Sequence, residues 1–219
     1  MNNLKGVGVA LVTPFNEDLS VDFDSLTRLI EYNIENGTNY LVVLGTTAEA
    51  ATLSKEEKKE VIKHVIKINS KRLPLVLGIG GNNTLEVKKQ IEETDLSDFD
   101  AVLSVSPYYN KPNQEGLYQH YKALAETGKQ IIIYNVPGRT GQNIEAATTV
   151  RLANDFPNLF MIKEACPNIN QYFDILRTKP EGFSLVSGDD EYALPVTLAG
   201  GDGVISVIGQ GYPKEFSTM

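Results

Sequence analysis

The stretch Leu159-Phe160-Met161-Ile162-Lys163-Glu164-Ala165 is an apolar run that leads directly into a lysine. A run of this length, bounded by turn residues, predicts a buried strand. Side chains alternate between the two faces of a strand, so we expect Lys163 to share its face with Met161 and Leu159. A core on that face would remove the amine from water and favour its neutral form, which can attack a carbonyl to form a Schiff base. The alternative is a strand-end lysine whose amine reaches solvent.

The bulk composition is that of a globular protein, with 42% apolar and 22% charged residues among 219. The net charge of −8 argues against a nucleic-acid partner or an acidic membrane surface. No apolar run approaches the roughly 20 residues of a membrane span, and no leader pattern is present, so we expect a cytoplasmic protein. The single cysteine, Cys166, excludes an intramolecular disulfide. The two histidines, His64 and His120, lie in polar helical stretches, which argues against a histidine metal site.

Short apolar segments alternate along the whole chain with segments of helical spacing. The expected strands are residues 6–12, 40–44, 73–77, 101–105, 130–134, 159–163, 183–186 and 203–207. Strict alternation favours a parallel sheet, and continuous apolar runs suit a sheet covered on both faces. Eight such units predict an α/β fold of the (β/α)8 TIM-barrel type. A doubly wound open sheet is the alternative, although the glycine loop 78–81 lacks the dinucleotide-binding pattern.

The helices between these strands carry recognisable start signals. Ser54 and Glu57 form a capping box, and Thr84 is expected to cap the following helix. Pro213 is expected at the first position of an eighth helix, just before the sequence stops at Met219. Because a barrel needs that helix to cover its last and first strands, we expect residues 1–219 to be one (β/α)8 catalytic domain that is truncated at its C-terminus.

Residues with chemical potential collect directly after the strands, where the active site of a (β/α)8 barrel is built. They are Thr46, Thr47, Glu49, Tyr108, Tyr109, Tyr134, Arg139, Lys163, Gly188 and Asp189. Tyr134 shares a face with Ile132, and Thr46 is expected to share one with Leu44 and Val42, so both can point the same way as Lys163. A tyrosine and a threonine beside a Schiff-base lysine can pass protons.

Other members of this set suit anionic groups. Arg139 can hold a carboxylate through two hydrogen bonds, and the backbone N–H groups at Thr46 and Thr47 can receive a carboxylate or an oxyanion. The run Asp189-Asp190-Glu191 is expected to cap the following helix rather than to bind a metal.

Five segments resemble the dihydrodipicolinate synthase family, of the pyruvate-dependent class I aldolase and N-acetylneuraminate lyase superfamily. They are Gly45-Thr46-Thr47-Ala48-Glu49, Ser106-Pro107-Tyr108-Tyr109-Asn110, Tyr134-Asn135-Val136-Pro137-Gly138-Arg139-Thr140, Ile162-Lys163-Glu164-Ala165 and Gly200-Gly201-Asp202-Gly203-Val204-Ile205-Ser206. The resemblance covers essentially the whole chain, in order and spacing. It implies a cytoplasmic lyase of lysine and diaminopimelate biosynthesis, with pyruvate and L-aspartate 4-semialdehyde as substrates.

The resemblance also implies catalytic roles. Lys163 would form the Schiff base with pyruvate, and Tyr134 would carry protons beside it. Thr46 would link Tyr134 to Tyr109 in a hydroxyl relay, with Tyr109 contributed across a subunit contact of a homo-oligomer, a tetramer or a dimer. No separate cofactor is implied, because the covalent Schiff base carries the chemistry.

Substrate and effector positions follow from the same resemblance. Thr47 would hold the pyruvate carboxylate, Arg139 the carboxylate of the semialdehyde, and Gly188 and Ile205 would line the pyruvate pocket. Lysine-sensitive members bind their effector at positions that match Asn82, Glu86 and Tyr108. Lys55 and Lys58 stand where sensitive members often carry histidines, so we expect weak or absent feedback by lysine.

Two departures from the family pattern bear on activity. The usual glycine after the paired threonines is Ala48, which would cost about 1 kcal/mol if that position needs a positive φ. The family also continues past residue 219 with a C-terminal helical region. The missing region leaves open a catalytically incompetent fragment or binding-only domain. An N-acetylneuraminate lyase or another 2-keto acid aldolase is the alternative within the superfamily, because it would keep Lys163 and Tyr134 and use different loop residues for its second substrate.

Overall fold

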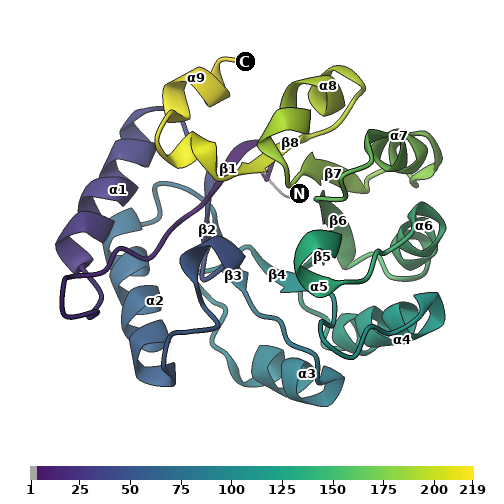
Figure 1. Cartoon of the computed structure of the whole chain (residues 1–219), viewed down its shortest axis with the longest axis horizontal. Helices are drawn as coiled ribbons and strands as arrows, with labels where there is room; N and C mark the ends of the chain where they lie inside the picture. The colour runs from purple at the N-terminus through teal and green to yellow at the C-terminus, as the bar shows by residue number, and fades with distance from the viewer. Residues whose placement is uncertain (1–3) are drawn as a thin grey trace.

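Parallel strands close into a barrel, because the first strand, Gly6–Ala10, pairs with both the second, Tyr40–Val43, and the last, Gly203–Ser206 (Figure 1). The computed structural model describes residues 4–219, so the first three residues of the expected domain lie outside the described part. The strands are β1 (Gly6–Ala10), β2 (Tyr40–Val43), β3 (Leu75–Gly78), β4 (Ala101–Val105), β5 (Ile131–Asn135), β6 (Leu159–Glu164), β7 (Ser184–Ser187) and β8 (Gly203–Ser206). The predicted TIM barrel is confirmed, and its closure excludes the open doubly wound sheet.

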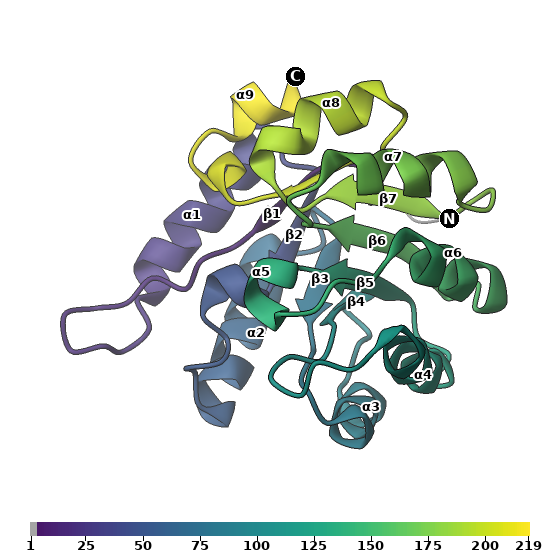
Figure 2. The same ribbon diagram turned by 45° about the vertical axis from the view of Figure 1, so that its right-hand side comes forward.

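Helices surround this barrel on the outside (Figure 2), except for one short helix after β5. They are α1 (Phe23–Glu35), α2 (Lys55–Asn69), α3 (Thr84–Glu93), α4 (Gln114–Ala125), α5 (Pro137–Thr140), α6 (Ala146–Asp155), α7 (Ile169–Thr178), α8 (Ala193–Leu198) and α9 (Pro213–Ser217). Three 3₁₀ turns follow β2, β7 and β8, namely η1 (Thr46–Ala48), η2 (Asp190–Tyr192) and η3 (Ile208–Gln210). Pro213 begins α9 as predicted. The single-turn α5, which the sequence pattern did not predict, lies inside the ring of outer helices beside the end of β5 (Figure 1).

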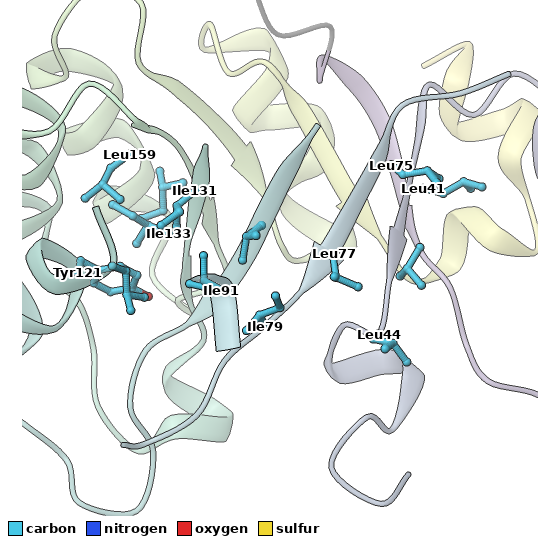
Figure 3. Packing of buried hydrophobic residues seen from close by; sticks show 14 of the residues in the cluster. Leu41, Leu44, Leu75, Leu77, Ile79, Ile91, Tyr121, Ile131, Ile133 and Leu159 are labelled. Carbon is cyan, nitrogen blue, oxygen red and sulfur yellow. The ribbon is translucent and has the colours of Figure 1, made fainter. Parts of the chain in front are cut away.

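The apolar side chains form two layers, one between strands and helices and one inside the barrel. Met161 belongs to the inner layer, as predicted for a residue on the face of Lys163. The prediction for Leu159 is wrong, because Leu159 packs in the outer layer with Ile131 and Ile133 (Figure 3). A break in the β5–β6 register at Phe160 separates the two residues: Ile131 pairs with Leu159, whereas Ile132 pairs with Met161. This extra residue reverses the alternation of side chains.

A second reversal occurs at the end of β2. Val42 faces the barrel interior, but Leu44 lies in the outer layer (Figure 3), so the expectation that Thr46 shares a face with Leu44 is wrong. The φ angle of Leu44 is 55°, a left-handed conformation that turns the chain before η1. Such conformations are costly for residues with a side chain, and the buried surroundings of Leu44 hold it there.

The helix starts partly follow prediction. The capping box of Ser54 and Glu57 is present at the start of α2. The N-cap of α3 is Asn83, whose side chain accepts the Glu86 N–H, so the prediction for Thr84 is wrong. Either side chain suits a cap, but the Thr84 hydroxyl instead contacts Nδ1 of His120 at 2.8 Å.

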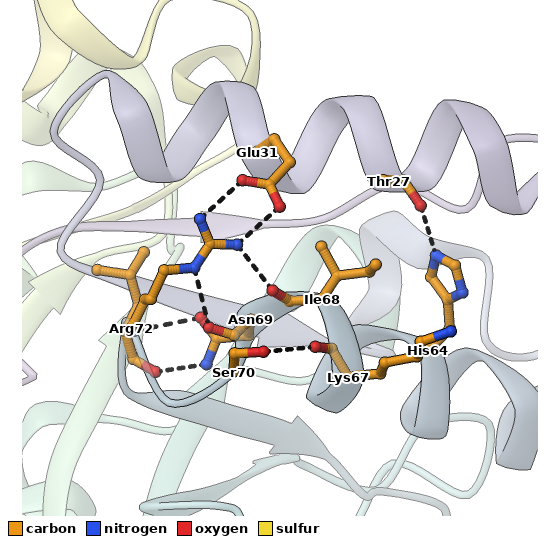
Figure 4. A network of polar contacts seen from close by, with 9 residues as sticks. Thr27, Glu31, His64, Lys67, Ile68, Asn69, Ser70 and Arg72 are labelled. Atoms are coloured by element: carbon orange, nitrogen blue, oxygen red, sulfur yellow. Dashed lines mark hydrogen bonds and ion pairs between the residues drawn. The ribbon is translucent and has the colours of Figure 1, made fainter.

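Polar contacts join α1 to α2 on the outside of the barrel (Figure 4). The guanidinium of Arg72 donates two hydrogen bonds of 2.7 Å to the carboxylate of Glu31, the paired geometry that arginine favours. His64 Nε2 lies 2.8 Å from the Thr27 hydroxyl, and burial lowers its pKa. This histidine therefore serves the helix contact.

His120 makes stability depend on pH. Burial lowers its pKa from 6.5 to about 4, so the folded state resists a proton that the unfolded chain accepts. The stabilisation is complete above the unfolded pKa and is lost as pH falls through the folded one. Between pH 7 and 4.5 we expect the wild type to lose roughly 2 to 3 kcal/mol more unfolding free energy than His120→Asn. Urea unfolding of both proteins at the two pH values measures this difference, and equal losses would contradict it.

The ring of Tyr40, the register partner of Gly8 on β2, leaves no room for a side chain at position 8. A Cβ added at Gly8 would lie 2.1 Å from that fully buried ring, inside the barrel. We expect Gly8→Ala to lower the unfolding free energy by about 2 to 3 kcal/mol, because a packed core cannot absorb the extra carbon. Gly138→Ala is the matched control for urea unfolding, since a Cβ there meets no atom within 4 Å. A Gly8→Ala protein with the unfolding free energy of wild type would contradict this prediction and show that the Tyr40 ring can move aside.

Candidate active site

Two neighbouring strand ends place Tyr134 and Lys163 side by side. Tyr134 on β5 is the register partner of Lys163 on β6. The flanking residues Ile132 and Met161 belong to the inner layer, so alternation directs both side chains into the barrel. The C-terminal ends of the strands, where both residues sit, form the end at which barrel enzymes carry their chemistry.

The amine of Lys163 is removed from solvent. The residue is 2% exposed, and its Nζ lies 4.4 Å from the centre of the Tyr134 ring. No ion pair joins this amine to a carboxylate within residues 4–219. Buried charged side chains are normally paired, so a buried lysine without an ion-pair partner among the described residues, at this end of the barrel, is a candidate functional residue. The strand-end lysine that reaches solvent is therefore excluded.

Gly188 packs against the lysine side chain, and Ile205 lies in the inner layer of the barrel. A Cβ at Gly188 would lie 3.0 Å from Cε of Lys163 and 2.8 Å from Cβ of Ala165, so glycine leaves room for the chain of methylenes. Its N–H donates to the Glu164 carbonyl at 2.6 Å, which ties the β7 end to β6. Ile205 is fully buried in the inner layer with Met161. Gly188 thus lies where a pocket beside Lys163 needs a wall.

The turn η1 brings the paired threonines Thr46 and Thr47 to the same end of the barrel as Lys163 and Tyr134. Thr46 Oγ1 lies 3.4 Å from the Tyr134 hydroxyl, across the barrel from β2 to β5. Thr47 is partly exposed beside it, and Thr13 holds the turn by donating to the Ala48 carbonyl at 2.8 Å. Ala48 itself has no positive φ; the left-handed residue of this turn is Glu49, at 54°. The substitution of glycine by Ala48 therefore causes no backbone strain.

Arg139 lies on α5, which follows the β5 end that carries Tyr134. Its side chain is exposed, and no acidic group among residues 4–219 forms an ion pair with it. Pro137 occupies the start of this one-turn helix, and the Arg139 N–H donates to the Val136 carbonyl at 2.9 Å. An arginine held at the barrel rim without an acidic partner is free to bind an incoming carboxylate.

The two tyrosines after β4 face outward. Tyr109 is 89% exposed and Tyr108 is 41% exposed, and Tyr109 has a φ of 72°. The Tyr109 hydroxyl makes no hydrogen bond within the described part of the chain, so the structure does not bring it to Thr46. The predicted effector positions lie nearby on adjacent loops, because Asn110 donates to the Asn82 carbonyl at 3.1 Å. Glu86 is exposed in the first turn of α3.

The acidic run after β7 does not cap the helix that follows it, so that prediction is wrong. No side chain caps η2 or α8. Instead, Asp190 accepts hydrogen bonds from the Ser206 hydroxyl and from the backbone N–H groups of Val207 and Ile208, which anchors the turn after β8. Cys166 is buried, and burial raises the pKa of its thiol, which fits a structural cysteine.

A further polar group near Lys163 was missed from the sequence. Glu164, the next residue, is fully buried on the opposite face of β6, and Asn135 is its register partner. Asn135 Nδ2 donates to the Glu164 carboxylate at 2.7 Å. Strand alternation after Lys163 and after Tyr134 could have placed these two residues together behind the site.

Two surveys of the described residues complete the description of the site. Within residues 4–219, no cluster of three or more histidine, cysteine, aspartate or glutamate side chains is arranged to hold a metal ion. No helix in that range is long and apolar enough to span a membrane. A cavity of about 440 Å³, lined by Asp95, Asp100 and Lys129 among others, lies where β4 and β5 begin, at the opposite end of the barrel.

The fold and the site together define a (β/α)8-barrel enzyme of the lysine-dependent aldolase class. The Dihydrodipicolinate synthetase family model matches residues 3–219, and the chain belongs to this family. The 4-hydroxy-tetrahydrodipicolinate synthase of Flavobacterium psychrophilum is 59% identical over 215 residues, which are 98% of this chain and 73% of the relative. The resemblance noted in the sequence is thereby confirmed.

Solved structures agree with this assignment. The dihydrodipicolinate synthase of Thermotoga maritima has a TM-score of 0.95 at 41% identity, over 99% of this chain and 75% of that one. The chloride-inhibited dihydrodipicolinate synthase of Acinetobacter baumannii, complexed with pyruvate, has a TM-score of 0.94 at 45% identity, over 98% and 74% of the two chains.

Proposed function

We propose that this lyase condenses pyruvate with L-aspartate 4-semialdehyde to give 4-hydroxy-tetrahydrodipicolinate, the reaction for which its relatives are named. The observation that carries the proposal is the buried amine of Lys163, 4.4 Å from the Tyr134 ring at the barrel mouth. Lysine and diaminopimelate biosynthesis is the corresponding pathway. The names of the relatives favour this synthase over an N-acetylneuraminate lyase.

The Lys163 amine attacks the keto carbon of pyruvate, and water leaves to give the Schiff base. Loss of a methyl proton forms an enamine, whose carbon adds to the aldehyde of the second substrate. The amino group of that substrate then attacks the former keto carbon and releases Lys163 as the ring closes. Tyr134 and Thr46 move the protons of these steps. No separate cofactor takes part.

Four residues bind the substrates in this proposal. Thr47 receives the pyruvate carboxylate, and Gly188 and Ile205 form the wall behind it. Arg139, at the rim and without an acidic partner, receives the carboxylate of the semialdehyde.

Tyr109 completes the relay from a neighbouring copy in a homo-oligomer, a dimer or a tetramer. Its 89% exposure and its left-handed backbone support a role in contact with another chain. The effector positions Asn82, Glu86 and Tyr108 border the same loops, and weak lysine feedback remains our prediction. We place this single catalytic domain in the cytoplasm, which suits a chain with one cysteine.

Trapping with pyruvate and borohydride, followed by peptide mass spectrometry, tests the function. We expect a reduced pyruvyl adduct on Lys163, together with turnover of L-aspartate 4-semialdehyde. Cleavage of sialic acid without turnover of the semialdehyde would assign the lyase activity instead. No adduct and no turnover of either substrate would leave a binding-only domain or an incompetent fragment.

A further inference from the structure

A buried polar cluster lies directly behind the Tyr134–Lys163 pair. The next register pair, Asn135 and Glu164, points the opposite way, into the layer between strands and helices. Both residues are fully buried. The pair that faces the pocket and the pair that faces the helices are thus consecutive on the same two strands.

The Glu164 carboxylate accepts hydrogen bonds on both oxygens. Oε1 receives Asn135 Nδ2 at 2.7 Å and the Cys166 N–H at 2.8 Å, and Oε2 receives Gln171 Nε2 from α7 at 2.8 Å. All three partners are donors. An ionised carboxylate only accepts hydrogen bonds, so this arrangement is made for the charged form.

The side-chain amides of Asn135 and Gln171 also hold the C-terminal end of the segment that carries Arg139. Asn135 accepts the Ile144 N–H at 2.9 Å and donates to Oδ1 of Asn143 at 2.8 Å. Gln171 accepts from Asn143 at 2.7 Å and donates to the Ile144 carbonyl at 3.1 Å. Segment 136–144, which contains α5, therefore leaves β5 and returns to one cluster centred on Glu164.

The surroundings of Glu164 do not neutralise its charge. Burial raises its pKa to about 7, against the lowering effect of its hydrogen bonds. The titratable groups that interact with it are Tyr121 of α4, Tyr172 of α7 and the Cys166 thiol, none of them a cation. Lys163 points to the opposite face of β6. Burying a carboxylate without a cationic partner costs folding free energy. Because Glu164 lies beside the site, we interpret it as a functional residue.

We propose that Glu164 is a positioning residue, whose carboxylate sets segment 136–144, and with it Arg139, at the distance from Lys163 that the second substrate needs. The inference rests on the proposed function for the identity of that substrate. The β5 and β6 ladder holds Lys163 and Tyr134 without this carboxylate. Glu164 therefore acts on the second substrate and leaves capture of pyruvate unchanged.

Glu164→Gln tests this role, because it keeps the shape but turns one acceptor into a donor that faces another donor. We expect the borohydride-trapped pyruvyl adduct on Lys163 and the KM for pyruvate to stay within twofold of wild type. We expect kcat/KM for L-aspartate 4-semialdehyde to fall about 10- to 100-fold, as for small misplacements of a positioning group. Hydrogen exchange of the amides in segment 136–144 should accelerate at least about tenfold, while that of β6 stays slow.

Three comparisons separate positioning from a general structural role. The exchanged variant Glu164→Gln/Gln171→Glu keeps one carboxylate facing one amide and should recover most of the lost kcat/KM. Glu145→Gln, an exposed change beside the same segment, should leave every parameter unchanged. In wild type, kcat/KM for the semialdehyde should fall below about pH 7 with the titration of Glu164, and this limb should be absent in Glu164→Gln.

Unchanged kinetics and unchanged exchange in Glu164→Gln would overturn the proposal. Equal losses for pyruvate and the semialdehyde, with faster exchange throughout the barrel, would also overturn it in favour of a purely structural role. An absent adduct in wild type would instead refute the proposed function. The exchange of segment 136–144 in Glu164→Gln would still decide whether this carboxylate holds the Arg139 segment.

Discussion

Replacing Lys163 by methionine is expected to abolish the pyruvyl adduct and to lower kcat by about 10³-fold or more, because it removes the amine on which the Schiff base is proposed to form. Methionine reaches as far as Cε of the lysine and suits a side chain that packs against Gly188 and lies beside the Tyr134 ring. It also removes a buried polar group that has no ion-pair partner among the described residues. The unfolding free energy should therefore stay the same or rise by up to about 1 kcal/mol.

The measurement combines borohydride trapping, turnover and urea unfolding on the same preparations. Lys67→Met is the matched control, since Lys67 is exposed on α2, away from the barrel mouth. It should leave the adduct and the rate unchanged. A Lys163→Met protein that retains turnover would contradict Schiff-base catalysis, and a trapped adduct on another lysine would move the site.

Replacing Tyr134 by phenylalanine should lower kcat by about 10²-fold or more, while the protein keeps its fold. The ring beside the Lys163 amine remains, so the packing that excludes water is preserved. Only the hydroxyl that faces Thr46 at 3.4 Å is removed. General acid–base groups typically contribute at least this factor, and the amine can still capture pyruvate, although more slowly.

Tyr40→Phe is the matched control for Tyr134→Phe. Both tyrosines are buried inside the same barrel, but the Tyr40 hydroxyl has no hydrogen-bond partner among residues 4–219. Its removal should leave the rate unchanged and raise the unfolding free energy by about 1 kcal/mol, because a buried unsatisfied hydroxyl is costly. Steady-state rates and single-turnover trapping distinguish the two variants. A rate unchanged by Tyr134→Phe would remove this tyrosine from the proton relay.

The sequence contained enough local information to predict the fold and most of the cluster at the mouth. Apolar runs and helix caps depend on residues within a few positions of one another, and they marked the units of the barrel. The register of β5 and β6 then placed Tyr134 beside Lys163, as strand alternation predicted. The catalytic and binding roles of these residues stay predictions until the variants are measured.

Several features of the site depend on pairing between distant segments and could not be predicted from the sequence. The register break at Phe160 moved Leu159 to the outer layer, and the left-handed turn at Leu44 changed the approach to Thr46. Neither has a signal in the local pattern, because each is fixed by the neighbouring strand or the packing around it.

The local pattern was therefore sufficient to predict that a lysine ends a buried strand of a barrel. The tertiary structure decided what surrounds that lysine. The 3.4 Å contact of Thr46 with Tyr134 joins residues 88 positions apart, and the bond of Asn135 to Glu164 joins residues 29 apart. The removal of the Glu164 carboxylate from water, which raises its pKa, likewise requires the layers of the barrel to close around it.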